Sequence, residues 1–348
     1  MANKPTAPQT SFAMLGNGSW GTALAIHLAK QGHSVSLWGR EEDLTAILLE
    51  QRVNTRYLPG IPLPNGIEIQ ADLIAAMSQS KQIIVAVPSH AFASLLNTIK
   101  PHWTPEHRLL WVTKGLDADS GEFLHTIAAR ILGPDVPMAI LSGPSFAKEV
   151  GAGLPTAVVV ATTNAAWGMD LVNAFSAPQF RVYPSADLIG IQVGSVVKNI
   201  IAVAAGIGDA LGFGANARAA LISRGLAEMI RFGEQLGAQR DKLIALAGCG
   251  DMILTCTDNQ SRNRRFGLAL GKGKTQDEAT AEIGQVVEAI HNIDQVHELA
   301  LKKGIEMPIS EAVYGVLHQL TTPETAVGAL FSRPTKTEYS LANWNKIV

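Results

Sequence analysis

The segment Gly16-Asn17-Gly18-Ser19-Trp20-Gly21 constrains the fold of this chain more than any other feature. An apolar run, residues 12–15, precedes it, and residues 22–31 continue with helical spacing until Gly32. A strand, a G-x-G-x-x-G turn and a helix in this order are typical of a Rossmann unit, in which the glycines permit a tight turn, a close approach to pyrophosphate and close helix packing. A further expected strand, residues 34–38, follows. The motif therefore stands in the context that dinucleotide binding requires.

Short apolar runs alternate with helical segments over the first half of the chain. The expected strands cover residues 83–87, 109–112, 138–141, 156–162 and 180–183. Continuous apolar runs are typical of strands buried on both faces, so the alternation predicts an α/β domain with a doubly wound, mostly parallel sheet. Ligands bind beyond the carboxyl ends of such strands. Residues 88–90, 113–115 and 143–145 follow three of them, and we expect them to line one crevice.

Strand patterns end near residue 186, and helical spacing takes over. The expected helices cover residues 188–211, 217–236, 241–246, 263–270, 275–283, 286–303 and 309–320. This pattern predicts an all-α second domain. We divide the chain into a polar N-terminal extension (1–11), a Rossmann domain (12–189), a helical domain (190–335) and a C-terminal tail (336–348).

Composition excludes several classes of protein. The net charge of −2 argues against a nucleic-acid partner, and two cysteines do not form a disulfide framework. The polar N-terminus does not resemble a secretory signal. Residues 195–208 form the most apolar later segment, which is too short and too polar to span a bilayer. We expect a cytoplasmic protein with no membrane insertion and no bound metal.

Lys198 and Asp251 are candidates for acid–base chemistry. Lys198 lies among small and apolar neighbours in a nearly uniform apolar helix, so it is either a buried lysine with a lowered pKa or one whose head reaches the surface. Asp251 follows a glycine-rich segment and is either a helix cap or the carboxylate that faces Lys198. A lysine with a lowered pKa suits proton transfer to or from an alcohol or carbonyl.

Ser261-Arg262-Asn263-Arg264-Arg265 begins an expected helix and favours binding of a phosphate, because arginine forks match phosphate oxygens. Arg262 is the arginine that we expect on the phosphate, whereas Arg264 and Arg265 are expected to face solvent or cover a cofactor. A solvated charged face is the alternative. His90, His125 and His291 show no catalytic-triad or metal-ligand spacing.

The combined motifs closely resemble those of the bacterial NAD(P)-dependent sn-glycerol-3-phosphate dehydrogenases over about residues 12–330. They are the glycine turn, Thr113-Lys114-Gly115, Gly143-Pro144-Ser145-Phe146-Ala147-x-Glu149-Val150, Val197-Lys198-Asn199, Gly248-x-Gly250-Asp251 and Ser261-Arg262-Asn263. The resemblance implies a helical domain like that of 6-phosphogluconate dehydrogenase, a homodimer, and reduction of dihydroxyacetone phosphate for glycerophospholipid synthesis.

The resemblance also implies roles for individual residues. Lys198 matches the proton donor and acceptor, and Lys114 and Asp251 complete the catalytic group. Substrate contacts match Lys114, Gly143, Ser145, Asp251, Ser261, Arg262 and Asn263. Contacts to NADP or NAD match Gly16, Gly18, Ser19, Trp20, Gly21, Arg40, Lys114, Ala147, Arg262, Val286 and Glu288.

Arg40 favours NADPH as a coenzyme. NAD-specific Rossmann domains place an acidic residue at the end of the second strand, about twenty residues after the glycines, to bind the ribose 2′-hydroxyl. Here Gly39 and Arg40 occupy that place, and Glu41 and Glu42 fit the first turn of the next helix. A guanidinium at this position can pair with a 2′-phosphate.

Two other functional classes remain open from the sequence. One is a related two-domain dehydrogenase for another hydroxy acid, which would not need a phosphate cradle at Arg262. The other is a catalytically silent NADP-binding sensor, which would have no use for a buried lysine opposite Asp251.

Overall fold

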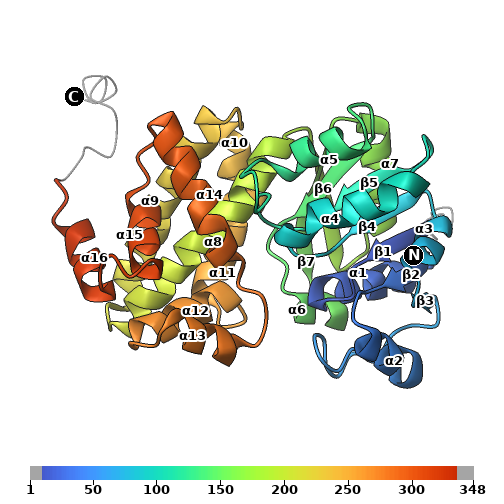
Figure 1. The fold of residues 1–348 in the computed structure, drawn as a ribbon, viewed down its shortest axis with the longest axis horizontal. Coiled ribbons are helices and arrows are strands. Elements are labelled where there is room, and N and C mark those ends of the chain that lie inside the picture. Colours follow the sequence, from blue (N-terminus) through green and yellow to red (C-terminus); the bar gives the residue numbers. More distant parts are fainter. Residues whose placement is uncertain (1–9, 335–348) are drawn as a thin grey trace.

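The computed structural model describes residues 10–334 (Figure 1). The first half forms one eight-stranded sheet in the order β3-β2-β1-β4-β5-β6-β7-β8, in which only the β6–β7 pair is antiparallel. The predicted mostly parallel, doubly wound sheet is confirmed. The strands are β1 (Ser11–Leu15), β2 (Ser34–Trp38), β3 (Ile67–Gln70), β4 (Gln82–Val85), β5 (Arg108–Trp111), β6 (Met138–Ser142), β7 (Thr156–Thr162) and β8 (Phe180–Ser185).

Helices cover both faces of this sheet. One apolar core lies under α1 (Ser19–Lys30), α2 (Glu42–Gln51), α6 (Ala147–Ala152) and α7 (Ala165–Phe175), and another lies under α3 (Leu73–Ser78), α4 (Ser89–Ile99) and α5 (Leu124–Leu132). A short 3-10 helix, η1 (Lys100–His102), follows α4. Along β1, Phe12 and Met14 point to the first core and Ala13 and Leu15 to the second. Burial on both faces explains why the strands lack polar alternation.

The second half is helical and packs around α8 (Leu188–Ala210), as Figure 1 shows. Its other helices are α9 (Gly214–Gln235), α10 (Arg240–Leu243), η2 (Leu246–Gly250), α11 (Asp251–Thr257), α12 (Arg262–Gly271), α13 (Gln276–Ile283), α14 (Glu288–Lys303), α15 (Pro308–Leu317) and α16 (Pro323–Phe331). The predicted all-α character of this half is confirmed.

Helix α8 is longer than the apolar segment that the sequence singled out. It has 23 residues, and its most apolar window has a mean hydropathy of 1.8, so its length and composition would allow it to cross a membrane. The expectation that this region is too short was therefore wrong. However, 89% of its most apolar window is buried inside the protein. Helix α8 is thus placed as the core helix of the second half.

The sequence prediction gave no range for several elements, among them β3, α11 and α16. Strand β3 has four residues and alternates in burial at the sheet edge, so it lacks the apolar run that marks the other strands. Helix α11 follows the π-helical turn η2, whose glycines indicate a loop. Helix α16 begins at Pro323, beyond the last expected helix. Most of the predicted extension and the whole predicted tail (336–348) lie outside the described residues.

Candidate active site

The glycine turn has the shape of a phosphate cradle. Gly16 has φ +129°, and a Cβ there would lie 2.6 Å from the carbonyl oxygen of Ala86. A Cβ on Gly21 would lie 1.9 Å from the oxygen of Gly16, whereas one on Gly18 would meet nothing within 4 Å. The turn is therefore closed on its inner side and open at Gly18. Helix α1 begins at Ser19 without a side-chain cap, which leaves its N-terminal N–H groups for an anion.

Two further details fit a dinucleotide at this turn. The indole Nε1 of Trp20 is buried and has no hydrogen-bond partner among the described residues. A Cβ on Gly39 would lie 1.9 Å from the side chain of Asn17, so any larger residue there would force Asn17 to shift. Glu41 is the N-cap residue of α2, and its carboxylate pairs with Arg56 and accepts from the hydroxyl of Tyr57.

Arg40 is exposed just after β2 and has no ion pair within residues 10–334, in contrast to Glu41, whose carboxylate is already engaged. It lies close enough to His90 to help lower the pKa of that histidine, although burial and the neighbouring His291 have larger effects. Beside the second strand, the structure thus places the guanidinium of Arg40, whereas the carboxylate of Glu41 is already paired.

The segments that follow three strands come together, as predicted. A Cβ on Gly115 would lie 2.6 Å from the side chain of Ser89, which places the segments after β4 and β5 in contact. The Nζ atom of Lys114 lies 3.5 Å from the carbonyl oxygen of Gly143, after β6. The hydroxyl of Ser145 also donates to that oxygen, at 2.9 Å.

Beside these segments lies a cluster of three charges from both halves of the chain. Nζ of Lys198, on α8, lies 2.5 Å from Oδ2 of Asp251, and Nζ of Lys114 lies 3.0 Å from the same oxygen. The side chains of Lys198 and Asp251 are 5% and 2% exposed, and that of Lys114 is 20% exposed. Of the alternatives that the sequence left open, the structure shows Lys198 buried and paired with Asp251.

Burial and the neighbouring charges shift the pKa values of this cluster in different ways at Lys198 and Asp251. It lowers the pKa of Lys198 to about 7, because Asp251 only partly offsets the loss of solvent and the Lys114 charge adds to the lowering. Burial alone would raise the pKa of Asp251, but the ammonium groups of Lys114 and Lys198 outweigh it and hold that pKa below its usual range. The arrangement holds an amine that can gain or lose a proton near neutral pH beside a carboxylate that stays ionised.

Glycine contacts bring Asp251 to Lys198. A Cβ on Gly194, one turn before Lys198, would lie 2.8 Å from the oxygen of Ala247, and one on Gly248 would lie 2.0 Å from the oxygen of Leu243. The π-helical turn η2 therefore lies directly on α8 and α10. Asp251 begins α11 immediately afterwards. Single π-helical turns of this kind are often found at functional sites.

The N-terminus of α12 lies against this cluster. Ser261 caps the helix, since its Oγ accepts from the N–H of Arg264. Asn263 donates to Oδ1 of Asn199, next to Lys198, and accepts from the N–H of Ala289. Its side chain thus joins α8, α12 and α14, and both its oxygen and its amide nitrogen already have partners.

The three arginines of α12 have different surroundings. Burial lowers the pKa of Arg262, with Glu288 opposing and Arg265 adding to this effect. Arg264 is only 7% exposed, pairs with Asp209 and donates to the oxygen of Cys256 at 3.1 Å. The expectation that Arg264 faces solvent or a cofactor was therefore wrong, since it braces α12 internally. The Nε atom of Arg265 is buried without a partner among the described residues.

The start of α14 and the residues just before it hold two cofactor candidates. Glu288 begins the helix and accepts from the hydroxyl of Ser89 at 3.0 Å, and its burial raises its pKa. Val286 lies two residues earlier, and Ala147 begins α6.

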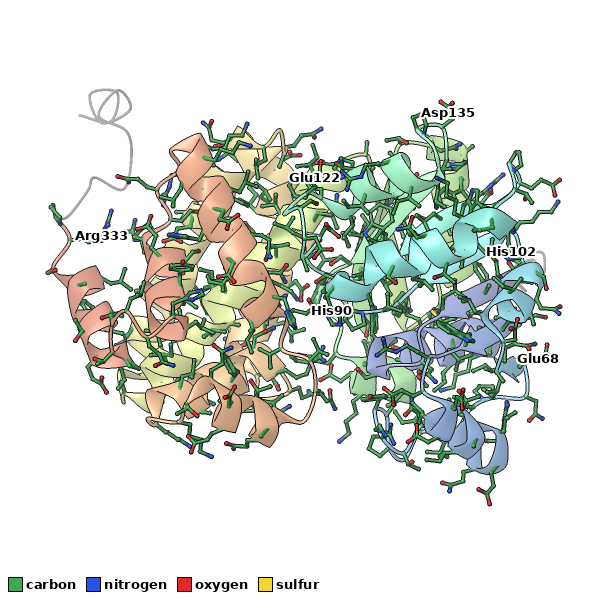
Figure 2. The ribbon with its side chains drawn as sticks, viewed as in Figure 1. Glu68, His90, His102, Glu122, Asp135 and Arg333 are labelled. Atoms are coloured by element: carbon green, nitrogen blue, oxygen red, sulfur yellow. The ribbon has the colours of Figure 1, made fainter. Side chains whose placement is uncertain are left out.

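The rings of His90 and His291 lie 5.1 Å apart, so these histidines meet although they are distant in sequence. Figure 2 shows His90 where the two halves of the molecule adjoin.

Sequence reasoning gave no role to two polar residues of this cluster. Thr255 accepts from Nζ of Lys198 at 3.2 Å and donates to the backbone oxygen of Asp251 at 2.5 Å. Asn199 holds Asn263, as described above. A helical register for α11 would have revealed Thr255, which lies one turn after Asp251 on the same face.

Comparison with known proteins agrees with this geometry. Residues 11–168 and 187–328 match the families described as NAD-dependent glycerol-3-phosphate dehydrogenase, N-terminus and C-terminus. The glycerol-3-phosphate dehydrogenases [NAD(P)+] of Photorhabdus laumondii and Shewanella frigidimarina are 49% and 52% identical, each over 94% of this chain and 97% of the relative. The structure of glycerol-3-phosphate dehydrogenase from Coxiella burnetii matches with a TM-score of 0.91 and 47% identity, over 93% of this chain and 99% of that one. The chain therefore belongs to the NAD-dependent glycerol-3-phosphate dehydrogenase family.

Proposed function

We propose that this protein reduces dihydroxyacetone phosphate to sn-glycerol 3-phosphate with NADPH or NADH, and so supplies glycerol 3-phosphate for glycerophospholipid synthesis. The observation that carries the proposal is the buried group Lys198–Asp251–Lys114, which lies at the carboxyl ends of the sheet strands beside the N-terminus of α12. A sensor that only bound NADP would gain nothing from this costly burial of charge.

Each part of the site has a proposed task. The glycine turn and the N-terminus of α1 hold the coenzyme pyrophosphate, with Ser19, Trp20, Arg40, Ala147, Val286 and Glu288 beside the rest of the coenzyme. The coenzyme, when bound, supplies the hydride. Arg262 and the N–H groups at the start of α12 hold the substrate phosphate, with Gly143, Ser145, Ser261 and Asn263 around the substrate.

Lys198 moves the proton in this mechanism. Its Nζ donates a proton to the C2 carbonyl oxygen during reduction and takes it back from the alcohol in the reverse direction. Lys114 adds positive potential where charge develops on that oxygen. Asp251 keeps the two ammonium groups in place, and Thr255 orients Nζ of Lys198 through the hydrogen bond between them.

Substrate phosphate is the basis of a direct test. The purified protein should oxidise NADPH with dihydroxyacetone phosphate and react very poorly with dihydroxyacetone, because Arg262 would lose its charged partner. The measurement is NADPH absorbance against time with each compound. Equal rates with both would point to a dehydrogenase of another hydroxy compound, and no oxidation with either would point to a silent binding protein.

Replacing Arg262 should weaken substrate binding. In Arg262→Ala we expect KM for dihydroxyacetone phosphate to rise by about tenfold or more, as the loss of a charge-assisted hydrogen bond implies. Arg240→Ala, which removes an exposed arginine paired with Glu234, is the matched control and should leave KM unchanged. If Arg265→Ala raises KM more than Arg262→Ala does, the phosphate is bound by Arg265 instead.

Replacing Arg40 should change the choice of coenzyme. In Arg40→Ala we expect kcat/KM for NADPH to fall about tenfold while the value for NADH stays nearly constant, because only NADPH carries the 2′-phosphate that the guanidinium can pair with. Steady-state kinetics with both coenzymes measure this. An equal loss for the two coenzymes would contradict the 2′-phosphate role.

We also propose a cytoplasmic location, a homodimer and a division into domains at residues 12–189 and 190–335. Strand β8 ends at Ser185 and α8 begins at Leu188, which supports a boundary in this region. Sedimentation of the purified protein would test the homodimer.

A further inference from the structure

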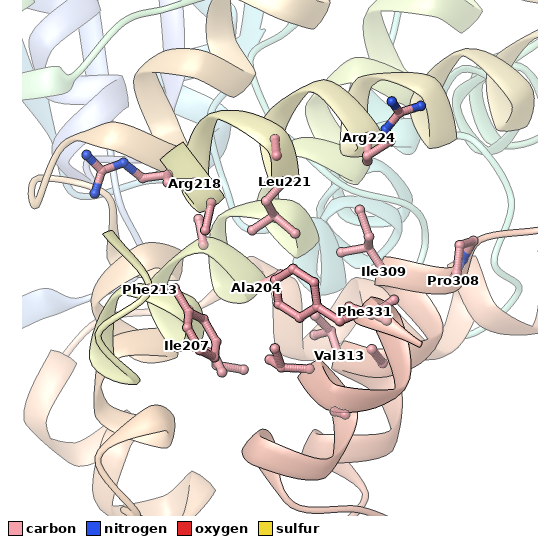
Figure 3. Close-up of a pocket in the computed structure, with 18 of the residues that line it drawn as sticks. Ala204, Ile207, Phe213, Arg218, Leu221, Arg224, Pro308, Ile309, Val313 and Phe331 are labelled. Carbon is pink, nitrogen blue, oxygen red and sulfur yellow. The ribbon is translucent and has the colours of Figure 1, made fainter. Parts of the chain in front are cut away.

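A cavity lies in the helical half, away from the charge cluster. It has a volume of about 440 Å³ and lies between α8, α9, α15 and α16. Figure 3 shows apolar side chains converging on it, among them Ala204, Ile207, Leu221, Ile309 and Val313. Pockets for small ligands usually have volumes of about 300–1,000 Å³ and mostly apolar walls. This cavity therefore has the size and lining of a ligand site.

The charges around the cavity favour an anion. Four arginines line it: Arg218, Arg224, Arg231 and Arg333. In Figure 3 the head groups of Arg218 and Arg224 lie on different sides of the apolar side chains that line the cavity. The three acidic residues of the lining have partners in the protein: Asp209 pairs with Arg218 and Arg264, Glu228 accepts from the N–H groups of Ile309 and Ser310, and Glu306 lies 4.0 Å from Arg333.

Helix α8 and the ion pairs of Asp209 link the lining of the cavity to the helices that carry the proposed substrate site. Ala204 and Ile207 lie on α8, the helix that carries Lys198. Asp209, at the end of α8, binds Arg218 through both carboxylate oxygens at 2.9 Å and also binds Arg264 of α12. A ligand that drew Arg218 away from Asp209 would thus act on the helix whose N-terminus we assign to the substrate phosphate.

We propose that this cavity is an effector site for an amphipathic anion, with an acyl or alkyl chain among the apolar side chains and an anionic head group at the arginine rim. Its ligand is a fatty-acid carboxylate or a lipid phosphate. Its occupation changes KM for dihydroxyacetone phosphate.

Dodecyl phosphate and dodecanoate, below their micelle concentrations, are the probes for calorimetric titration of the full chain. We expect saturable binding of at least one, and the stronger of the two identifies the head group. Dodecyltrimethylammonium, which has the same chain and a positive head, and inorganic phosphate, which has no chain, should not bind here. Equal binding of the cationic probe would overturn the proposal, since it would leave no role for the arginines.

Variants separate this cavity from the active site. Arg224→Glu at the rim and Ala220→Phe at an exposed lining position should each raise Kd by about tenfold or more, whereas Lys302→Glu, outside the lining, should not change it. Arg262→Ala should retain binding. If Arg262→Ala alone abolishes binding, the probe occupies the substrate site and the proposal fails.

Two further outcomes would overturn it. If the protein is a dimer that dissociates in Phe213→Asp or Phe331→Asp, and only the dissociated form binds the probe, a second copy covers the cavity. If only a chain ending at Pro334 binds the probe, the following residues occupy the cavity instead. Binding without any change in KM for dihydroxyacetone phosphate would contradict the effector role.

Discussion

Lys198→Met should lower kcat by roughly 10²–10⁴, the usual contribution of a general acid or base. Methionine keeps an unbranched chain of similar length at a position that is 4% exposed, so the loss should come from the proton and not from packing. Binding of NADPH, measured by fluorescence titration, should change little. Lys302→Met, at an exposed position, is the control. A kcat close to that of the unchanged protein would remove Lys198 from the mechanism.

The pH profile gives this prediction a second readout. Reduction needs Lys198 protonated, and burial lowers its pKa to about 7, so the rate of reduction should fall as pH rises through that value. Oxidation of glycerol 3-phosphate needs the neutral amine and should rise over the same range. In Lys198→Met, neither the fall in the reduction rate nor the rise in the oxidation rate should appear over this pH range. Lys114→Met removes a like charge, so the surviving activity should show its limb at higher pH.

Asp251→Asn should affect both stability and activity strongly. Two ammonium groups would lose their shared carboxylate in a site that is almost entirely buried, and breaking a buried ion pair in this way costs about 3–5 kcal/mol. The pKa of Lys198 should fall further, because Asp251 is the group that raises it, and the protonated fraction at neutral pH should drop. We expect a lower free energy of unfolding in urea together with a lower kcat for reduction.

The sign of its pH dependence distinguishes this explanation from a simple packing defect. In the variant, the folded-state pKa of Lys198 lies further below the unfolded value, so the stability deficit should be largest at pH 6 and should shrink toward pH 9, where the amine is neutral. Asp241→Asn, which removes an exposed aspartate paired with Lys242, should cost little at any pH. A deficit that does not change with pH would contradict the electrostatic account.

Much of this architecture could be predicted because the relevant signals are local. The apolar runs of β4, β5 and β6 are buried on both faces, and the glycines of the first turn are required by close backbone contacts. The small and apolar helical neighbours of Lys198 made its burial one of the two alternatives. Each of these features is encoded within a few residues of the position concerned.

The remaining features depend on contacts between distant segments. Whether Asp251 is a cap or faces Lys198 depends on η2 lying against Gly194, which the local glycine pattern does not reveal. Arg264 lies in a run of charges that usually faces solvent, but Asp209, 55 residues away, pairs with it in the core. His90 on α4 and His291 on α14 belong to different halves of the chain, and only the tertiary fold brings their rings together. Tertiary contacts of this kind override local patterns.

Helix α8 also has consequences for how the two halves can be exchanged between relatives. Its first residues, Leu188 and Ile191, belong to the apolar core beneath the sheet, together with Ala247 of η2, whereas the rest of α8 forms the centre of the helical half. A chimera joined at residue 187 would therefore combine the sheet of one parent with core residues beneath that sheet from the other parent. Successful recombination should require matching side chains at these three positions, so the halves of this protein are expected to evolve as one unit.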